Sequence, residues 1–279
     1  MITNLLKSSL QKLLAIGGME VRRIVPVPMG RARNSLLQLL EQARSVGLSP
    51  RTVIDVGAAY GSFTRLCHGV FPGAHYLLIE PLDEYRPLLE QVTHSIPSSR
   101  YRLAAACARN GGQLEINVHP DLVGSSLYRE VETGTGVNGV PRSVRAVTVD
   151  AVVHEAEASG PFLLKLDVQG AELDVLKGAE QILEECEFVV LEISFFKFFE
   201  DGPECADTIG YMKQRGFVPY DIVGLQYRPL DGALSQADIA FVKEHGLFRR
   251  QHAYATAAQR DAQNKQMQQY LHELFAGQS

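Results

Sequence analysis

The 279-residue sequence has no basic excess, no closely spaced cysteine pair and no long apolar run, and each absence excludes a class of protein. Its formal net charge is −5. Because a nucleic-acid-binding protein usually presents a basic face, we expect no nucleic-acid partner. The four cysteines are scattered without a C-x-x-C pair, a pattern that favours reduced cysteines in the core over disulfides or a metal site.

No apolar run reaches the roughly 18–20 residues that a transmembrane helix needs, and the first residues lack the continuous apolar core and the cleavage site of a signal peptide. We therefore expect a cytoplasmic protein. Residues 2–16 place leucines at helical spacing, with Lys7 and Lys12 off that face. Such a helix can lie on the inner face of an anionic membrane as a peripheral contact, or it can pack on the domain or on a second subunit.

The most informative segment of the sequence covers residues 52–63. An apolar, β-branched run that contains Asp55 ends in a turn with Gly57 and Gly61, and a helical pattern follows. A second apolar run ends at Glu80, 25 positions after Asp55. In a parallel-sheet domain this arrangement presents a nucleoside to backbone N–H groups at the turn and to a carboxylate that accepts both ribose hydroxyls.

The glycine spacing distinguishes between two cofactors. A dinucleotide fingerprint needs glycines two and five positions after Gly57, where this sequence has Ala59 and Ser62. The S-adenosylmethionine pattern, acidic-x-Gly-x-small-x-Gly, fits residues 55–61. We predict that the glycines allow close backbone approach to this cofactor, that Glu80 binds the ribose and that the acidic residue before the turn orders the loop. The predicted cofactor-binding residues are Asp55, Gly57, Ala58, Ala59, Gly61, Phe63, Glu80, Pro81 and Asp167.

Strand-like runs alternate with helical patterns through the middle of the sequence. The runs lie near residues 52–56, 75–80, 101–107, 162–167 and 187–193, and the helical patterns near 62–70, 82–94 and 171–185. This alternation predicts a parallel sheet with helices on both faces. Residues 113–118 and 143–149 resemble additional strands, and residues 34–46 resemble a further helix. The aperiodic segment 121–141 is a candidate lid over the substrate, because so long a loop is usually functional or disordered.

We expect three parts along the chain. Residues 1–49 hold amphipathic, basic helices and a linker, residues 50–250 form the α/β domain, and residues 251–279 form a C-terminal helix. One side of that last helix carries an apolar stripe of Met267, Tyr270, Leu271, Leu274 and Phe275. Such a stripe is more typical of a docking or dimer face than of a chemical site, so the terminal helices could support a homo-oligomer.

The second informative segment, residues 162–172, places two charged residues in an apolar strand. Lys165 and Asp167 interrupt a run that a central parallel strand should keep apolar, and period-two geometry puts both on one face. A buried ammonium needs a partner, and Glu192 in the next apolar run is the expected one. The charges either fix the strand register or form a polar floor beneath the methyl donor, and both interpretations stay open.

Asp167 ends that strand at the edge of the sheet where ligands bind. It could hold the cofactor's amino group, act as a general base on an acceptor hydroxyl or bind a cation; alternatively it caps a helix that begins at Gly170. Asp167 and Glu192 could supply oxygen ligands for Mg²⁺, although no compact metal motif is present. The candidate catalytic residues are Asp167, Lys165 and His119, which stands just before the candidate lid.

Three segments together resemble the FkbM family of S-adenosylmethionine-dependent methyltransferases: residues 53–61 (VIDVGAAYG), 79–81 (IEP) and 164–172 (LKLDVQGAE). Later landmarks of that family are similar to residues 125–127 (SSL), 148–150 (TVD) and 238–242 (DIAFV). The resemblance covers roughly residues 50–245, and its most specific part is the Lys-x-Asp-x-x-Gly-x-Glu segment. The family usually has Asn where this chain has Ala59, so one side-chain hydrogen bond of the loop is missing.

The resemblance implies a Rossmann-like α/β fold with a seven-stranded, mostly parallel sheet of the S-adenosylmethionine-dependent methyltransferase type, here with added N- and C-terminal helices. It also implies methyl transfer to a hydroxyl, typically of a sugar, a glycan or a natural-product acceptor. Two alternatives from other classes stay open. One is a non-catalytic nucleoside-binding protein on a methyltransferase fold. The other is an NAD-dependent oxidoreductase, against which the glycine spacing argues.

Overall fold

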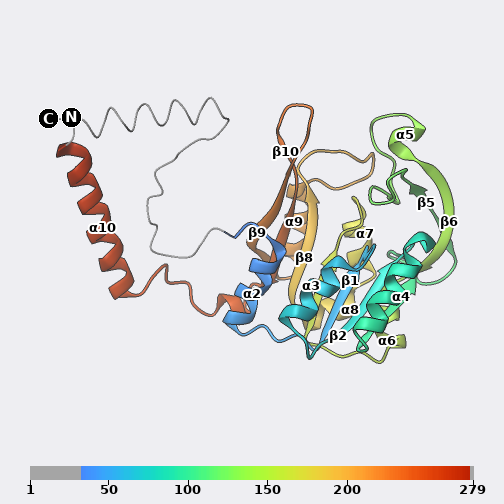
Figure 1. Ribbon diagram of the computed structural model, residues 1–279, viewed down its shortest axis with the longest axis horizontal. Helices are drawn as coiled ribbons and strands as arrows, with labels where there is room; N and C mark the ends of the chain where they lie inside the picture. Colours follow the sequence, from blue (N-terminus) through green and yellow to red (C-terminus); the bar gives the residue numbers. More distant parts are fainter. Residues whose placement is uncertain (1–32, 277–279) are drawn as a thin grey trace. The chain divides into compact units, whose positions relative to one another are not determined.

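A computed structural model describes residues 33–276, and a seven-stranded sheet lies at its centre (Figure 1). The strand order is β3-β2-β1-β7-β8-β10-β9, with all neighbours parallel except those of β10, which is antiparallel to both β8 and β9. The strands are β1 (Thr52–Val56), β2 (His75–Glu80), β3 (Ser99–Leu103), β7 (Phe162–Leu166), β8 (Cys186–Ser194), β9 (Phe217–Tyr227) and β10 (Leu234–Lys243). The predicted Rossmann-like, mostly parallel sheet is confirmed.

Helices cover both faces of the sheet because its central strands are apolar on both sides. Leu163 packs with α2, α3 and α4, whereas its neighbour Leu164 packs with α6, α7, α8 and α9 on the opposite face. These helices are α2 (Leu36–Val46), α3 (Ser62–Val70), α4 (Arg86–Ser95, preceded by the 3₁₀ turn η1 at Asp83–Tyr85), α6 (Val149–Glu155), α7 (Glu172–Lys177), α8 (Glu180–Glu185) and α9 (Cys205–Gln214). The helix predicted over 34–46 is therefore confirmed as α2.

A second, three-stranded sheet corrects one predicted strand. The run 101–107 is divided between β3 and the short β4 (Ala105–Ala106), which leaves the main sheet and pairs with β6. Its strands lie in the order β4-β6-β5, with β5 at Gln113–Val118 and β6 at Val140–Val147. The strand predicted at 143–149 thus begins earlier, at Val140. It also ends earlier, because the Thr148 hydroxyl accepts the Ala151 N–H and starts α6.

The helix predicted over 171–185 is two helices, α7 and α8, separated at Gly178. A Cβ atom at Gly178 would lie 2.1 Å from the Cys107 carbonyl oxygen, so the backbones approach too closely there for a side chain. Long-range packing rather than local propensity breaks this helix.

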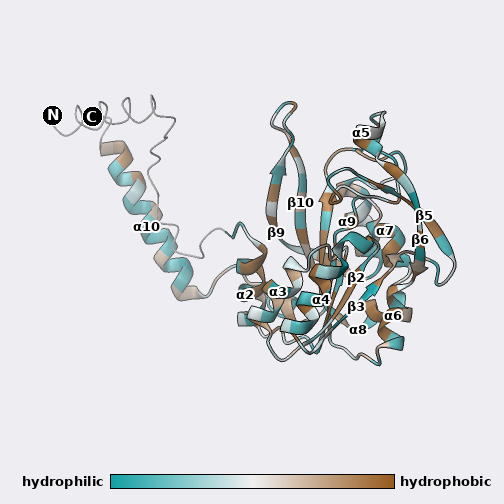
Figure 2. Ribbon diagram, turned by 45° about the vertical axis from the view of Figure 1, so that its right-hand side comes forward, coloured by the Kyte–Doolittle hydropathy of each residue, from teal (hydrophilic) through white to brown (hydrophobic). Residues whose placement is uncertain are grey.

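Two extensions project from one end of the sheet. The tip of the β9–β10 hairpin and the segment that contains α5 (Thr135–Asn138) both extend beyond the strands in Figures 1 and 2. Strand β8 ends at Ser194 opposite Gln236 near the start of β10, which places the hairpin tip at the carboxyl end of β8. This is the edge where ligands bind in open α/β sheets.

Helix α10 (Ala257–Ala276) belongs to a unit separate from residues 33–252. Its apolar side chains Met267, Leu271, Leu274 and Phe275 are exposed, and the proposed docking or dimer role of this stripe stays a prediction. The basic helix predicted at residues 2–16 lies outside the described residues, and the functional division at residues 49 and 250 also stays a prediction. No helix within residues 33–276 is long and apolar enough to cross a membrane.

Candidate active site

The turn between β1 and α3 presses against the end of β7. Gly57 has a φ of +74°, and a Cβ atom there would lie 1.8 Å from the Asp167 carbonyl oxygen. Gly61 has a φ of +76°, and a Cβ atom there would lie 2.6 Å from the Val92 side chain. Both positions therefore require glycine for conformation and for space. Ala59 also adopts a positive φ, +46°, which costs a residue with a Cβ some strain.

Two buried carboxylates hold this turn in place. Asp55 accepts hydrogen bonds from the Thr64 backbone N–H at 3.2 Å and from the Thr64 hydroxyl at 2.7 Å, which fixes the start of α3 to β1. Glu80 accepts the Ala59 N–H at 2.8 Å and the Leu82 N–H at 2.9 Å, one on each carboxylate oxygen. Burial raises the pKa of Asp55 to about 6 and that of Glu80 to about 7.

Hydrogen-bonding capacity remains at this turn. Each Glu80 oxygen keeps a second acceptor position, because a carboxylate oxygen has two lone pairs. Within the described residues, no hydrogen bond uses the backbone N–H groups of Tyr60, Ser62 and Phe63, which stand at the N-terminus of α3. The helix dipole favours a negatively charged ligand group at such an end.

A cavity lies between this turn, the end of β2 and the segment after β5. It brings together most of the predicted site residues, namely Asp55, Gly57, Ala58, Ala59, Phe63, Glu80, Pro81, Lys165 and Asp167. Gly61 shapes the turn, but neither it nor His119 is among the lining residues. The wall also includes Leu122, Val123 and Leu127 from the predicted lid segment, together with Tyr85 and Gln169, which local patterns did not single out.

Lys165 does not use Glu192 as its partner, which corrects the prediction. Its ammonium donates to the Asp238 carboxylate on β10 at 2.8 Å and to the Leu166 carbonyl at 3.3 Å, and it lies 3.5 Å from the Asp167 carboxylate. In the register of β7 and β8, Lys165 stands opposite the apolar Val190. Burial opposes the charge of Lys165, but the two carboxylates outweigh burial and raise its pKa above the usual value.

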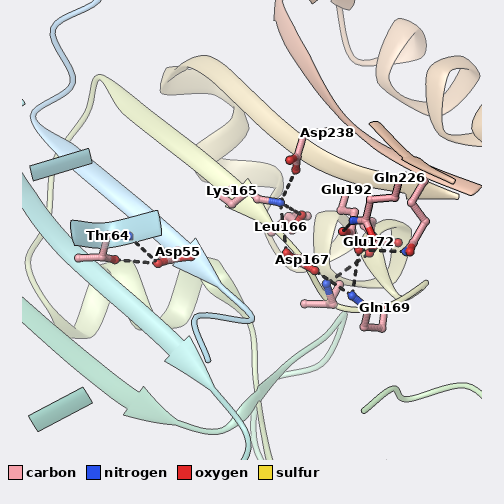
Figure 3. A network of polar contacts seen from close by, with 12 residues as sticks. Asp55, Thr64, Lys165, Leu166, Asp167, Gln169, Glu172, Glu192, Gln226 and Asp238 are labelled. Carbon is pink, nitrogen blue, oxygen red and sulfur yellow. Dashed lines mark hydrogen bonds and ion pairs between the residues drawn. The ribbon is translucent and has the colours of Figure 1, made fainter. Parts of the chain in front are cut away.

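Glu192 is surrounded by amides instead. Its carboxylate accepts hydrogen bonds from the side-chain nitrogens of Gln169 at 2.9 Å, Gln226 at 2.8 Å and Gln236 at 3.0 Å. Figure 3 shows Gln169 between Glu192 and Asp167, and its nitrogen also donates to Asp167 at 3.0 Å. Burial, followed by the charge of Asp167, raises the pKa of Glu192. The sequence analysis missed these glutamines, since nothing local marks them as neighbours.

Asp167 does not cap a helix, which corrects the alternative role considered for it. Helix α7 begins at Glu172 rather than Gly170, and its N-cap residue makes no side-chain hydrogen bond. The buried Glu172 carboxylate holds the turn, because it accepts the Val168 N–H at 3.3 Å and the Gly170 N–H at 3.2 Å. Burial raises the pKa of Glu172 to about 7.

The candidate lid is attached to this turn. The Ser126 hydroxyl donates to the Gln169 carbonyl at 2.6 Å, and Ser126 pairs with Asn117 in an isolated bridge. Leu122 and Leu127 from the same segment line the cavity. His119 lies outside the lining, and its Nδ1 atom is 2.6 Å from an Asp121 carboxylate oxygen.

The donor set between Asp167 and Glu192 does not fit Mg²⁺. A single amide nitrogen, that of Gln169, bridges the two carboxylates where a shared cation would bind. The Lys165 ammonium already lies beside Asp167 and Asp238. Within the described residues, no group of three or more His, Cys, Asp or Glu side chains is placed to hold a metal ion.

The close approach at Gly57 leads to a testable substitution. We expect Gly57→Ala to lower the free energy of unfolding by about 3 kcal/mol or more, because it adds both a steric clash and backbone strain. Gly73→Ala is the matched control, since nothing lies within 4 Å of a Cβ atom there. Urea denaturation measures both variants, and equal effects would contradict the proposed packing.

The buried carboxyls set a pH dependence of stability. The pKa values of Asp55, Glu80 and Glu172 are raised in the folded state, so the folded chain binds more protons than the unfolded chain. The contribution of these three carboxyls to the free energy of unfolding is complete below the pKa that each has in the unfolded chain. It declines as the pH rises to about 7, the folded-state pKa of Glu80 and Glu172. We therefore expect the unligated protein to lose stability between pH 5 and pH 8. The double variant Glu80→Gln/Glu172→Gln should show a smaller loss over this range. A wild type that gains stability over this range in urea denaturation would contradict the assignment.

The sequence is similar to a known protein family and to a curated relative. The family described as Methyltransferase FkbM domain matches residues 55–219, more than half of the chain. A curated relative, the hexuronic acid methyltransferase AglP of Haloferax volcanii, is 25% identical over 139 residues. This alignment covers 50% of this chain and 54% of the relative, so the chain spans about half the length of that protein.

Solved structures of methyltransferases are similar at lower identity. The FkbM methyltransferase of Methylobacillus flagellatus has 17% identity and a TM-score of 0.45, with coverage of 68% of this chain and 43% of that one. The magnesium protoporphyrin IX methyltransferase of Synechocystis, solved with bound SAM, has 10% identity and a TM-score of 0.39, with coverage of 77% and 86%. By the extent of the family match, this chain belongs to the FkbM methyltransferase family.

Proposed function

We propose that this protein is an S-adenosylmethionine-dependent O-methyltransferase that acts on a hydroxyl of a sugar, glycan or natural-product acceptor. The observation that carries the proposal is the cavity of this chain, a member of the FkbM family, in which the Glu80 carboxylate accepts a hydrogen bond from the glycine turn. Among the acceptor classes we favour a glycan, because the curated relative is named a hexuronic acid methyltransferase.

The cavity wall suits the parts of the donor. Glu80 has two free acceptor positions for the two ribose hydroxyls, and the N–H groups at the start of α3 suit the methionyl carboxylate. Beyond Glu80 the wall is apolar, with Leu82, Ala105 and Ala106, and suits a flat base. The glycine spacing and the position of Glu80 predict the same role for Glu80 and close backbone approach at the glycine turn.

Bound S-adenosylmethionine supplies an already activated methyl group, so the protein mainly orients the acceptor and accepts a proton. Asp167 is the candidate for that proton, because it lines the cavity and is held by Lys165 and Gln169. Lys165 then acts as a positioning residue that keeps the carboxylate directed toward the cavity. His119, the other candidate base, faces Asp121 outside the lining.

Cofactor binding provides the first test of this proposal. We expect S-adenosylmethionine and S-adenosylhomocysteine to bind with micromolar affinity in calorimetric titrations, and NAD not to bind. Glu80→Ala should weaken the binding of both adenosyl ligands by about 30-fold or more, since it removes the carboxylate that would accept two hydrogen bonds from the ribose hydroxyls. Glu90→Ala, at an exposed position of α4, is the control. A folded wild type that binds NAD or neither adenosyl ligand would contradict the proposal.

Methyl transfer provides the second test. Protein with [methyl-³H]S-adenosylmethionine is incubated with neutral sugars, hexuronic acids and glycans, and label in the acceptor is counted. With an acceptor that takes label, we expect Asp167→Asn to reduce the rate by about 10²–10⁴-fold and His119→Gln to leave it within a few-fold. Cofactor binding without transfer to any acceptor would favour the non-catalytic alternative, and the reverse order of the two variants would overturn the role of Asp167.

A further inference from the structure

Three glutamine side chains from three different elements converge on one carboxylate. Gln169 comes from the turn after β7, Gln226 from β9 and Gln236 from β10, and all three donate to Glu192 at 2.8–3.0 Å. We call these four residues the glutamine subsite. It adjoins the cofactor cavity, because Gln169 lines that cavity and also donates to Asp167.

The hydrogen bonds leave the subsite rich in acceptors. Glu192 can accept about four hydrogen bonds, and the amides use three of these positions. Because a carboxylate accepts only from the nitrogen of an amide, all three amide orientations are set. Within the described residues, the three amide oxygens have no hydrogen-bond partner. These oxygens are therefore available to the hydroxyl groups of a ligand.

The charge around the subsite is negative. Three carboxylates, those of Asp167, Glu192 and Asp238, face one ammonium, that of Lys165. The ammonium is buried and already has three oxygen partners. On the neighbouring hairpin, Arg228 donates two hydrogen bonds to the carboxylate of Asp231. No cation in the described part of the chain forms an ion pair with Glu192, whose raised pKa favours its protonated form near neutral pH. Lys165 balances only one of the two carboxylates beside it, Asp167 and Asp238, so an anionic ligand would meet at least one carboxylate without a counter-charge.

The subsite is fixed relative to the cofactor cavity by a strained residue. Gln169 has a φ of +51°, a conformation that a residue with a side chain adopts at a cost. The Ser126 hydroxyl bonds its carbonyl at 2.6 Å, and Glu172 bonds the N–H groups on either side of it. Surrounding contacts thus hold the amide between Asp167 and Glu192, where a ligand bound to one carboxylate would lie near the other.

We propose that the glutamine subsite binds the acceptor of the reaction as a neutral polyol, whose hydroxyls donate to the amide oxygens and to Glu192, and that it disfavours a hexuronate. This inference rests on the proposed methyltransferase function and specifies its acceptor. A reacting hydroxyl at Asp167 would have its neighbouring hydroxyls over Gln169 and Glu192. A sugar carboxylate in the same place would be repelled, which should cost about tenfold in affinity at these separations.

Two sugars that differ only at C6 test this inference. Methyl β-D-glucopyranoside and methyl β-D-glucuronide are titrated by NMR into protein saturated with S-adenosylhomocysteine, and the dissociation constants are compared. We expect the neutral glucoside to bind about tenfold more tightly. Glu192→Gln keeps the side-chain volume but removes the ionisable carboxyl, so in titrations at a pH where Glu192 is ionised it should bring the two constants close together. Gln226→Leu should weaken binding of the glucoside by about fivefold or more.

Controls separate this inference from the proposed function. Gln113→Leu is a matched substitution at an exposed glutamine that bonds only Ser143, and it should leave both constants unchanged. Gln226 is exposed, so its variant and the wild-type comparison serve if Glu192→Gln does not fold. Equal or tighter binding of the glucuronide, binding of neither sugar, or an unaffected Gln226→Leu would overturn the subsite. Failure to bind S-adenosylhomocysteine would instead contradict the proposed function.

Discussion

The carboxyl edge of the sheet depends on the contacts of one buried group, the ammonium of Lys165, with its oxygen partners. Its burial is costly, and only well-placed acceptors offset that cost. The acceptors come from two strands: Asp238 from β10, and Asp167 with the Leu166 carbonyl from the end of β7. The charge therefore ties β7 to β10 across the intervening β8, and loss of the ammonium would leave two neighbouring carboxylates without a cation.

Asp167 transmits this constraint to the glycine turn. Its carboxylate belongs to the polar network of Lys165 and Gln169, while its carbonyl oxygen occupies the space that a side chain at Gly57 would need. The glycine turn, held by Glu80 through the Ala59 N–H, thus packs directly against Asp167, which lines the cavity. The turn and the polar network share this residue, so a displacement of either would move the other.

Local patterns were sufficient to predict the glycine turn and most of the main sheet. The strands at 52–56 and 75–80 are short apolar runs between turn signals, and Glu80 is recognisable by its distance from the glycine turn. The partner of Lys165 was missed because Asp238 is 73 residues away on an antiparallel strand. A local signal was the polar alternation at Gln236 and Asp238, which period-two geometry places on one face.

The glycine turn and the glutamine subsite differ in how they are built. Backbone atoms of the turn and the Glu80 carboxylate form one wall of the cavity, and both lie inside the matched family region, residues 55–219. Gln226 and Gln236 lie beyond that region, on the β9–β10 hairpin, and their amides bond Glu192. The family match therefore constrains the glycine turn more than the glutamine subsite. Asp238, on the same hairpin, is different, because it is the partner of Lys165 and is tied to the turn through Asp167.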